Sequence, residues 1–400
     1  LLKVDIDVDA NYTNGISMGE PDESLEMTSG GLVAVGGDRE EIILRQVEPP
    51  DWIGNVVLTK LSSKISVYDV PTGGVALAFN GTDNVFSNTN DLPKTLYVQG
   101  DSVSGGLAQE VLHFQFEDGC PYDEIAFTVI QVELEKCASG FLPQGGTNDN
   151  TTTIRAFVTP DDVKGSFRFT LFDVSDEKGY CLNAPTNVPA SGEDSDAWKD
   201  YQFPSQALFT VSGAASNIAE TVSNDLHEAT VTIKSFDYGS YGKIKAEFMT
   251  QTGSFVFVAT EVDGTNEYTR LPADTNGNDI ADSWFGDVGP GASYSATNDS
   301  DNVPALGRVN GDGLSRYQEY RGFVIHGSHQ RTSPSDKDLF IYDEDNITLG
   351  YYGAVGLISH LILPSEWSGA GANSSDRVID INAETHDLPF PQHGLHLRDV

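Results

Sequence analysis

The sequence feature that most constrains the fold is a succession of short apolar runs through residues 1–260. Most are about four to eight residues long, and clusters of Gly, Asn, Asp and Pro separate them. Few stretches show the 3.6-residue period of an amphipathic helix. The pattern predicts strands at 32–35, 42–45, 56–61, 65–68, 75–79, 95–98, 111–116, 124–134, 153–158, 166–172, 207–211, 229–236, 243–249 and 254–260.

The spacing of the turn signals favours β-sandwiches over a barrel. The pattern restarts after a polar tract at 145–153, and segment 92–134 resembles the bacterial immunoglobulin-like domains of surface proteins, in which an extended strand leads from one sandwich into the next. We therefore expect a mainly β fold of tandem immunoglobulin-like sandwiches followed by a small α+β calcium-loop region. The expected domains are a sandwich with an acidic first strand at 1–136, a second sandwich at 137–262 and the calcium-loop region at 263–400.

Charge restricts the partners. Sixty Asp and Glu residues face 23 Lys and Arg, which gives a formal net charge of −37. Such a surface repels nucleic-acid phosphates and anionic lipids, so neither is expected as a partner. The chain has no apolar run of about 18 residues that would predict a membrane span. The acidic groups attract cations, although the charge could instead serve only to keep the protein soluble.

A calcium-loop pattern stands at residues 274–284, DTNGNDIADSW. Alternate positions carry oxygen ligands, and Ca²⁺ takes six to eight such oxygens from a tightly coiled loop. Gly277 stands where the chain must curl, and Trp284 is expected to begin a helix. The twelfth position holds Phe285 where a full EF-hand loop has Glu. The predicted ligands are Asp274, Asn276, Asn278, the carbonyl of Ile280, and Asp282.

A second pattern, NGDGLSRYQEY at 310–320, has the complementary defect, because Arg308 occupies the first ligand position. The predicted ligands are Asn310, Asp312, the carbonyl of Leu314, and Glu319, with an amphipathic helix over 314–325. Either each loop holds one ion with help from water and Asp287, Asp299 or Asp301, or both loops converge on fewer ions. An Asn/Asp-rich turn without metal is the simpler alternative.

The two loops together resemble the calcium loops of dockerins and thrombospondin type 3 repeats, which occur in secreted and surface proteins. The resemblance implies Ca²⁺ as the cofactor and a stabilising role, because extracellular modules of this kind bind calcium weakly.

Cysteines and sequons add weaker expectations. A strand at 124–134 would hold Cys120 and Cys137 too far apart for a disulfide, which leaves Cys137–Cys181 as the expected bridge. Six sequons permit glycosylation, at Asn11, Asn80, Asn150, Asn298, Asn346 and Asn373.

Most catalytic signatures are missing from the sequence. There is no HExxH, P-loop or dinucleotide fingerprint, and the GxSxG spacing occurs once, as GISMG at 15–19. Six of the eight histidines lie in the last 75 residues, which raises a zinc site as a lesser alternative; they are His326, His329, His360, His386, His393 and His396.

These features predict an extracellular or cell-surface calcium-binding protein with a structural or adhesive role, in a surface layer, filament or matrix. Its expected partners are further copies of itself, other surface proteins or glycans. The alternative is the non-catalytic portion, or a divergent form, of a secreted hydrolase such as a metallopeptidase or glycanase. Because the chain begins at Leu1 without a signal-type segment, we expect a processed protein or a fragment.

Overall fold

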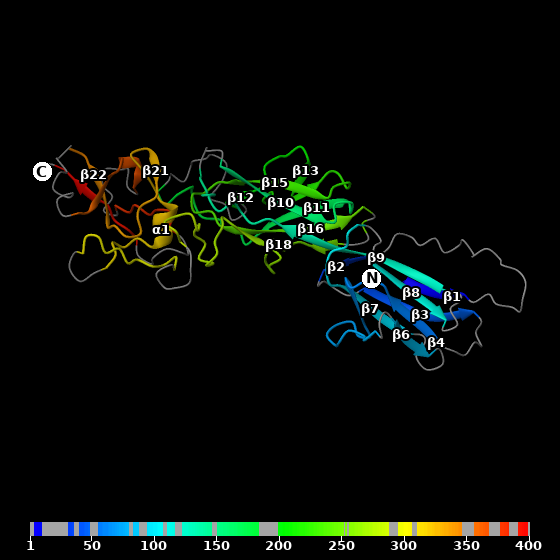
Figure 1. Cartoon of the computed structure of the whole chain (residues 1–400). Coiled ribbons are helices and arrows are strands. Elements are labelled where there is room, and N and C mark those ends of the chain that lie inside the picture. The colour runs from blue at the N-terminus through cyan, green and yellow to red at the C-terminus, as the bar shows by residue number, and fades with distance from the viewer. Residues whose placement is uncertain are drawn as a thin grey trace, which may run out of the picture.

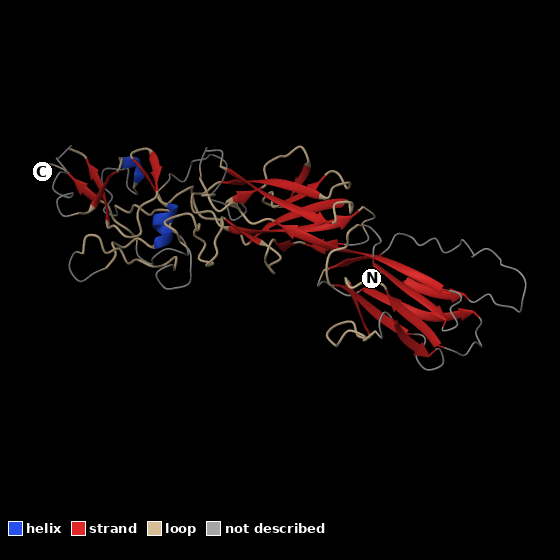
Figure 2. Ribbon diagram, in the orientation of Figure 1, coloured by secondary structure: helices blue, strands red, loops and turns tan. Residues whose placement is uncertain are grey.

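The computed structural model shows an elongated molecule in which two strand-rich regions are followed by a region of loops and small sheets (Figures 1 and 2). The structure describes residues 4–9, 31–35, 40–48, 55–79, 83–87, 94–106, 110–116, 122–145, 150–183, 199–251, 253, 256–287, 295–305, 310–345, 356–367, 377–383 and 391–398. The predicted mainly β fold is confirmed.

The first region contains a four-stranded sheet and part of a separate nine-stranded sheet. The four-stranded sheet has the order β1-β3-β7-β5, and β1 runs parallel to β3. Its strands are β1 (Val4–Asp9), β3 (Glu40–Glu48), β5 (Ile65–Tyr68) and β7 (Lys94–Gly100). The strands of the larger sheet in this region are β2 (Gly31–Ala34), β4 (Asn55–Lys60), β6 (Asp83–Ser87) and β8 (Glu110–Phe116). Inward side chains such as Leu58, Val67 and Leu96 are fully buried.

One long strand, β9 (Tyr122–Leu134), continues from the first region into the second. Its first half pairs with β8 over 122–127, and its last residues pair with β10 (Thr151–Thr159) over 131–134. The nine-stranded sheet therefore has the order β12-β15-β10-β9-β8-β4-β6, and β2 and β18 (Thr260–Glu261) also pair with β9. The remaining strands are β12 (Tyr201–Gln202) and β15 (Glu228–Ser235).

The second sheet of the second region has six strands in the order β13-β14-β11-β16-β17, with β19 also paired to β16. Its strands are β11 (Gly165–Phe172), β13 (Phe209–Ser212), β14 (Ile218–Thr221), β16 (Gly242–Thr250), β17 (Val256–Val258) and β19 (Thr269–Leu271). Strand β11 alternates strictly between buried and outward residues, as a strand with one face on a core does. Phe167, Phe169 and Phe248 fill this core with side chains from β10, β15 and β9.

The third region has little regular structure among its described residues. It contains α1 (Arg316–Arg321), the two-stranded sheet β20 (Phe323–Ile325) and β21 (Ser328–Gln330), a parallel sheet of β22 (Asp338–Asp343), β23 (Ile358–Leu361) and β24 (Leu395–Leu397), and the 3-10 turn η3 (Pro364–Glu366). The expected α+β domain is therefore not confirmed.

Two local predictions were wrong in this region. The helix expected over 314–325 covers six residues only, because Gly322 adopts a left-handed φ of 75° and the chain then enters β20. No helix begins at Trp284, where the described residues form turns. In the first region, segment 75–79 is also not a strand, and Val75 is largely exposed.

Helix α1 lies against the second region, and all six of its residues are buried. Its last residue, Arg321, donates to the carboxylate of Asp237, with Nη2 at 2.9 Å from Oδ2 and Nε at 3.1 Å from the same oxygen. Both side chains are fully buried. Tyr317 donates from its hydroxyl to the carbonyl of Gly239 at 3.0 Å. The loop after β15 thus anchors the helix that follows the second predicted calcium loop.

Candidate calcium centres

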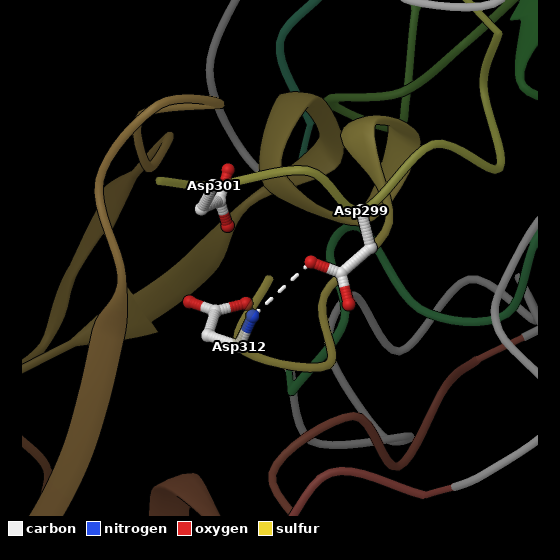
Figure 3. Close-up of side chains that lie close together, drawn as sticks. All are labelled: Asp299, Asp301 and Asp312. Atoms are coloured by element: carbon white, nitrogen blue, oxygen red, sulfur yellow. Dashed lines mark hydrogen bonds between the residues drawn. The ribbon is translucent and has the colours of Figure 1, made fainter. Parts of the chain in front are cut away.

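Three aspartates converge beside α1. Oxygen atoms of Asp299, Asp301 and Asp312 all lie within 4.8 Å of one another (Figure 3). Two further carboxylates interact with this group. Asp338, at the start of β22, acts electrostatically on Asp301, and the charges of Asp301, Asp312 and Asp338 act on Glu319 of α1. We call Asp299, Asp301, Asp312, Glu319 and Asp338 the acidic centre.

Backbone amides fix two of these carboxylates. Asp299 accepts from the amides of Asp312 and Gly313 at 3.1 and 3.0 Å. Asp312 accepts from the amide of Asp338 through Oδ2 at 2.6 Å, and this bond joins the loop to β22. The turn requires glycine at residue 311, where φ is 85° and a side chain would collide with the Asp299 carboxylate. The loop therefore holds its acidic groups together by its own backbone geometry.

Three carboxylate oxygens of the acidic centre are buried without a hydrogen-bond partner: Asp301 Oδ2, Glu319 Oε1 and Asp338 Oδ2. Asp301 and Glu319 are each only 1% exposed. A buried polar atom without a partner costs about 1–3 kcal/mol, and more if it is charged. Because the orphaned atoms are all carboxylate oxygens, a bound cation would satisfy them.

The pKa values of Asp301 and Glu319 are both raised, as expected for buried carboxyls with too little positive charge to neutralise them. Burial, with the nearby Asp312 and Asp299 charges, raises the pKa of Asp301 to about 8. Burial, with the charges of Asp301 and Asp312, raises the pKa of Glu319 to about 11. Without a cation the centre holds protons instead, which is the usual response of carboxylates that share a buried site.

The donor set matches the preference of calcium for hard oxygen ligands. Ca²⁺ accepts several carboxylates in a flexible shell, whereas Mg²⁺ keeps an octahedral shell of small radius and retains water. The imidazole of His360 already contacts Asp338 Oδ1 through Nε2 at 2.6 Å. The residues present therefore fit Ca²⁺ better than a nitrogen-preferring transition metal.

In the first predicted loop, backbone amides converge on Asp274. Asp274 accepts from the amides of Gly277 and Asp279 at 2.7 and 3.0 Å, and burial raises its pKa. Gly277 has a left-handed φ of 75°. Asn276 and Asn278 accept from backbone amides within the loop through Oδ1.

Asp287, two residues after Phe285, brings a further carboxylate to this loop. It is fully buried, and its Oδ2 accepts from the side-chain amides of Asn276 and Asn278 at 3.3 and 2.6 Å. Its other oxygen accepts from Arg316 Nε of α1 at 2.7 Å. We call Asp274, Asn276, Asn278, Asp282 and Asp287 the first centre.

Asp282 and Ile280, the other two predicted ligands of the first loop, make different contacts. Asp282 Oδ1 accepts from the amide and hydroxyl of Thr275 at 3.0 and 3.2 Å. The side chain of Ile280 is fully buried and packs with Trp284 and Tyr320. Ile280 thus anchors the loop to the core through its side chain.

Only some of the predicted ligands of the second loop lie in the acidic centre. Asp312 and Glu319 belong to the acidic centre, and the buried Leu314 anchors the loop, its amide donating to Asp312 Oδ1 at 2.9 Å. Asn310 is exposed. The sequence pattern missed Asp338, because β22 brings it in from outside any loop motif.

The expected disulfide is wrong. Cys137 and Cys181 are both free and buried, and they lie in separate apolar clusters. The prediction was reached by eliminating the other pairings, and elimination gave no information about which side chains meet. Cys120 lies outside the described residues.

Two sequons fall within the described residues. Asn150 donates from Nδ2 to the carbonyl of Leu142 at 3.0 Å, and Asn298 donates to the Ser300 hydroxyl at 2.8 Å. In both, the nitrogen that would carry a glycan is already engaged. The other four sequons, at Asn11, Asn80, Asn346 and Asn373, lie outside the described residues.

Histidines do not form a metal site in the part of the chain that the structure describes. His329 stacks on Tyr238, with ring centroids 3.3 Å apart, and burial lowers its pKa to about 3. His396 contacts Glu344 Oε2 through Nε2 at 2.8 Å. His386 lies outside the described residues, whereas His326 and His393 are exposed.

Comparisons with known proteins do not assign the chain to a family. No family model matches it, and no curated protein matches its sequence. Among solved structures, the Reelin-N domain of F-spondin is similar over 36% of this chain and 86% of that domain, at 10% identity and a TM-score of 0.23.

Two streptococcal domains are also similar. The C-terminal domain of the Streptococcus agalactiae AgI/II polypeptide BspA matches 54% of this chain and 82% of its own length, at 8% identity and a TM-score of 0.19. The C-terminal domain of the Streptococcus pyogenes antigen I/II-family protein AspA matches 50% and 81%, at 6% identity and a TM-score of 0.21. TM-scores this low give no basis for transferring a function. Within the described residues, no helix is long and apolar enough to cross a membrane.

Proposed function

We propose that this chain is an extracellular calcium-binding protein with a structural or adhesive role. The observation that carries the proposal is the acidic centre, with three buried carboxylate oxygens that have no partner among the described residues. Calcium at this centre would satisfy them and would join α1, the 299–301 segment, the 311–314 turn and β22.

The position of the acidic centre supports a stabilising role. Glu319 and Arg321 stand two residues apart on α1, and Arg321 binds Asp237 of the second region. Fixing Glu319 with an ion therefore also fixes the helix that anchors the third region to the second. An elongated chain of β regions (Figure 1) is suited to extend outward from a cell surface. Its net charge of −37 attracts cations.

The proposal is tested by equilibrium dialysis of the EDTA-treated chain against millimolar Ca²⁺, followed by elemental analysis and light scattering of the same samples. Bound calcium at one or more ions per chain, with a calcium-dependent increase in particle size, supports calcium binding and self-association together. Bound calcium with an unchanged particle size would retain the calcium site and reject self-association. Dialysed protein without calcium would reject the proposal.

A further inference from the structure

Two segments near the C-terminal end of the described chain pair with each other. The amide of Ile379 donates to the carbonyl of Gln392 at 2.9 Å, and an antiparallel bridge lies next to this bond. We call residues 377–383 and 391–394 the C-terminal clamp. Two of its polar side chains, those of Asp380 and Gln392, contact the turn and the helix that carry the acidic centre.

The side chain of Gln392 holds the turn that supplies Asp312. Its Nε2 donates to the carbonyl of Gly313, which has a left-handed φ of 99° and no room for a Cβ against Gln392. The amide of Gly313 donates in turn to Asp299 at 3.0 Å. Gly313 is therefore bound to the C-terminal clamp through its carbonyl and to the acidic centre through its amide.

Asp380 contacts helix α1. Its Oδ2 accepts from Nε2 of Gln318 at 3.2 Å, and Oε1 of Gln318 accepts from the backbone amide of Ser315 at 2.8 Å. Ser315 is the N-cap of the helix, and its carbonyl accepts from the amide of Glu319 at 3.0 Å. Asp380 therefore fixes, through Gln318, the helical turn that carries Glu319.

One carboxylate connects these two contacts. Oδ1 of Asp380 accepts from the backbone amide of Gln392 at 2.8 Å, so Asp380 orients both Gln392 and Gln318. Asp380 is only 3% exposed, and hydrogen bonds to a charged group are about twice as strong as those between neutral groups. Because both of its oxygens already accept from nitrogen donors, its role is to position other residues.

The C-terminal clamp is itself anchored outside the acidic centre. The amide of Asn382 donates at 3.0 Å to the carbonyl of Leu182, in the segment after β11, and the carbonyl of Asn382 accepts from Nη1 of Arg321 at 2.9 Å. Ile379 is buried in an apolar cluster with Leu182 and Leu314. These contacts give the clamp a fixed position from which it holds the turn and the helix.

Carboxylates that repel one another must be brought together to bind an ion, and ligands that other contacts already hold in place bind it more tightly. We propose that Asp380 and Gln392 are positioning residues for Ca²⁺ at the acidic centre, because they hold the first turn of α1 and the 311–314 turn in the arrangement that the ion requires. This inference rests on the proposed calcium binding. It makes calcium affinity depend on residues 62 and 79 positions along the chain from those that they contact in the helix and the turn.

Calorimetric titration of the EDTA-treated full chain with CaCl₂ tests the inference. Gln392→Glu keeps the length of the side chain but replaces the donor to Gly313 by an acceptor. Added negative charge alone would tighten calcium binding, whereas loss of the hydrogen bond would weaken it. We expect binding about threefold weaker, because one hydrogen bond corresponds to a factor of about two to ten in an equilibrium constant. Asp380→Ala, which removes both contacts, should weaken binding about tenfold or more.

Gln251→Glu is the matched control. Gln251 donates from Nε2 to Asp225 at 2.9 Å at an exposed position in the second region, so this variant makes the same chemical change away from the acidic centre. It should keep the wild-type Kd. Melting curves in EDTA are recorded for the same proteins, because a purely structural role would lower the Tm and leave the Kd of the folded chain unchanged.

The outcomes separate the two proposals. If the wild type binds calcium and Gln392→Glu binds it at least as tightly, the inference is overturned and calcium binding stands. A lower Tm of both variants in EDTA with an unchanged Kd also overturns the inference. No bound calcium in the wild type overturns both proposals. If Asp380→Ala does not fold, Gln392→Glu still decides, because Gln392 is partly exposed.

Discussion

Replacing Glu319 by glutamine should separate calcium binding from folding. Glutamine keeps the shape of the side chain but cannot carry its charge. Burial and nearby carboxylates raise the pKa of Glu319 to about 11, so without calcium the wild-type side chain is protonated at pH 8. A neutral amide therefore replaces a neutral acid, and the melting temperature in EDTA should stay at or slightly above that of the wild type.

With calcium the two proteins should differ. Extracellular calcium modules have a Kd of about 10⁻⁴–10⁻³ M, so about 10 mM Ca²⁺ is roughly 10 to 100 times Kd. At that ratio binding stabilises the folded chain by about 1.4–2.7 kcal/mol. For a cooperative unit of about 150–250 residues this corresponds to a rise in Tm of about 3–10 °C. Glu319→Gln should lose most of this rise.

The assay is a thermal melt followed by circular dichroism, in EDTA and in calcium. Glu220→Gln is the matched control, because Glu220 is half-exposed and lies on β14 in the second region. An undiminished calcium-dependent rise in the Glu319 variant would refute the assignment of this side chain as a ligand. An equal loss of Tm in EDTA and in calcium would show that Glu319 serves folding alone.

Three further predictions concern pH, the glycine turn and the thiols. In EDTA the chain should lose stability as the pH rises from about 4 to about 8. Over this range the buried carboxyl of Asp301, whose pKa is about 8, keeps its proton in the folded state, whereas the same carboxyl in the unfolded chain has lost it. The calcium-induced rise in Tm should therefore grow with pH, and a rise that shrinks instead would contradict the account. Gly311→Ala should weaken calcium binding about tenfold in calorimetry. Strain at a left-handed φ costs about 1–3 kcal/mol, and the new side chain would collide with Asp299. Gly73→Ala is the control, because Gly73 also has a left-handed φ, of 66°, but a side chain there would meet no other atom, so calcium binding should be unchanged. Peptide mapping without reductant should find Cys137 and Cys181 unlinked, and both should resist thiol reagents in the native chain, because burial raises their pKa to about 11 and about 12.

Strands could be predicted well from the sequence. Alternation in segments such as 153–158 and 166–172 survives in β10 and β11, because one face of each strand packs on a core and the pattern reports that directly. Segment 75–79 failed because an apolar run does not show whether a pairing partner exists. The long β9 was predicted as an extended strand, and the structure shows it shared between two regions.

The candidate sites were less predictable because they combine residues that are distant in the sequence. The loop pattern indicated Asp274, Asn276 and Asn278, and the backbone holds them in one coil. Asp287 and Asp301 were recognised only as nearby acidic residues, since their place depends on how the loops fold back. Asp338 carried no local signal, because its position depends on the placement of β22.

Helix α1 shows the same limit. The sequence predicted twelve residues of amphipathic helix, but every residue of the six-residue helix is buried, by contacts from its own region as well as from the second. Amphipathic patterning assumes a solvent face, and here tertiary contacts cover all sides. The ion pair of Arg321 with Asp237 is one such contact, and it has no signature in the local sequence.

The most direct test of the central claim is a crystal structure of the chain grown in CaCl₂, with anomalous data collected to locate calcium. The account predicts an anomalous peak about 2.3–2.6 Å from carboxylate oxygens of Asp301, Asp312 and Glu319. An acidic centre without a peak, in which these carboxylates bond to protons or water, would contradict it.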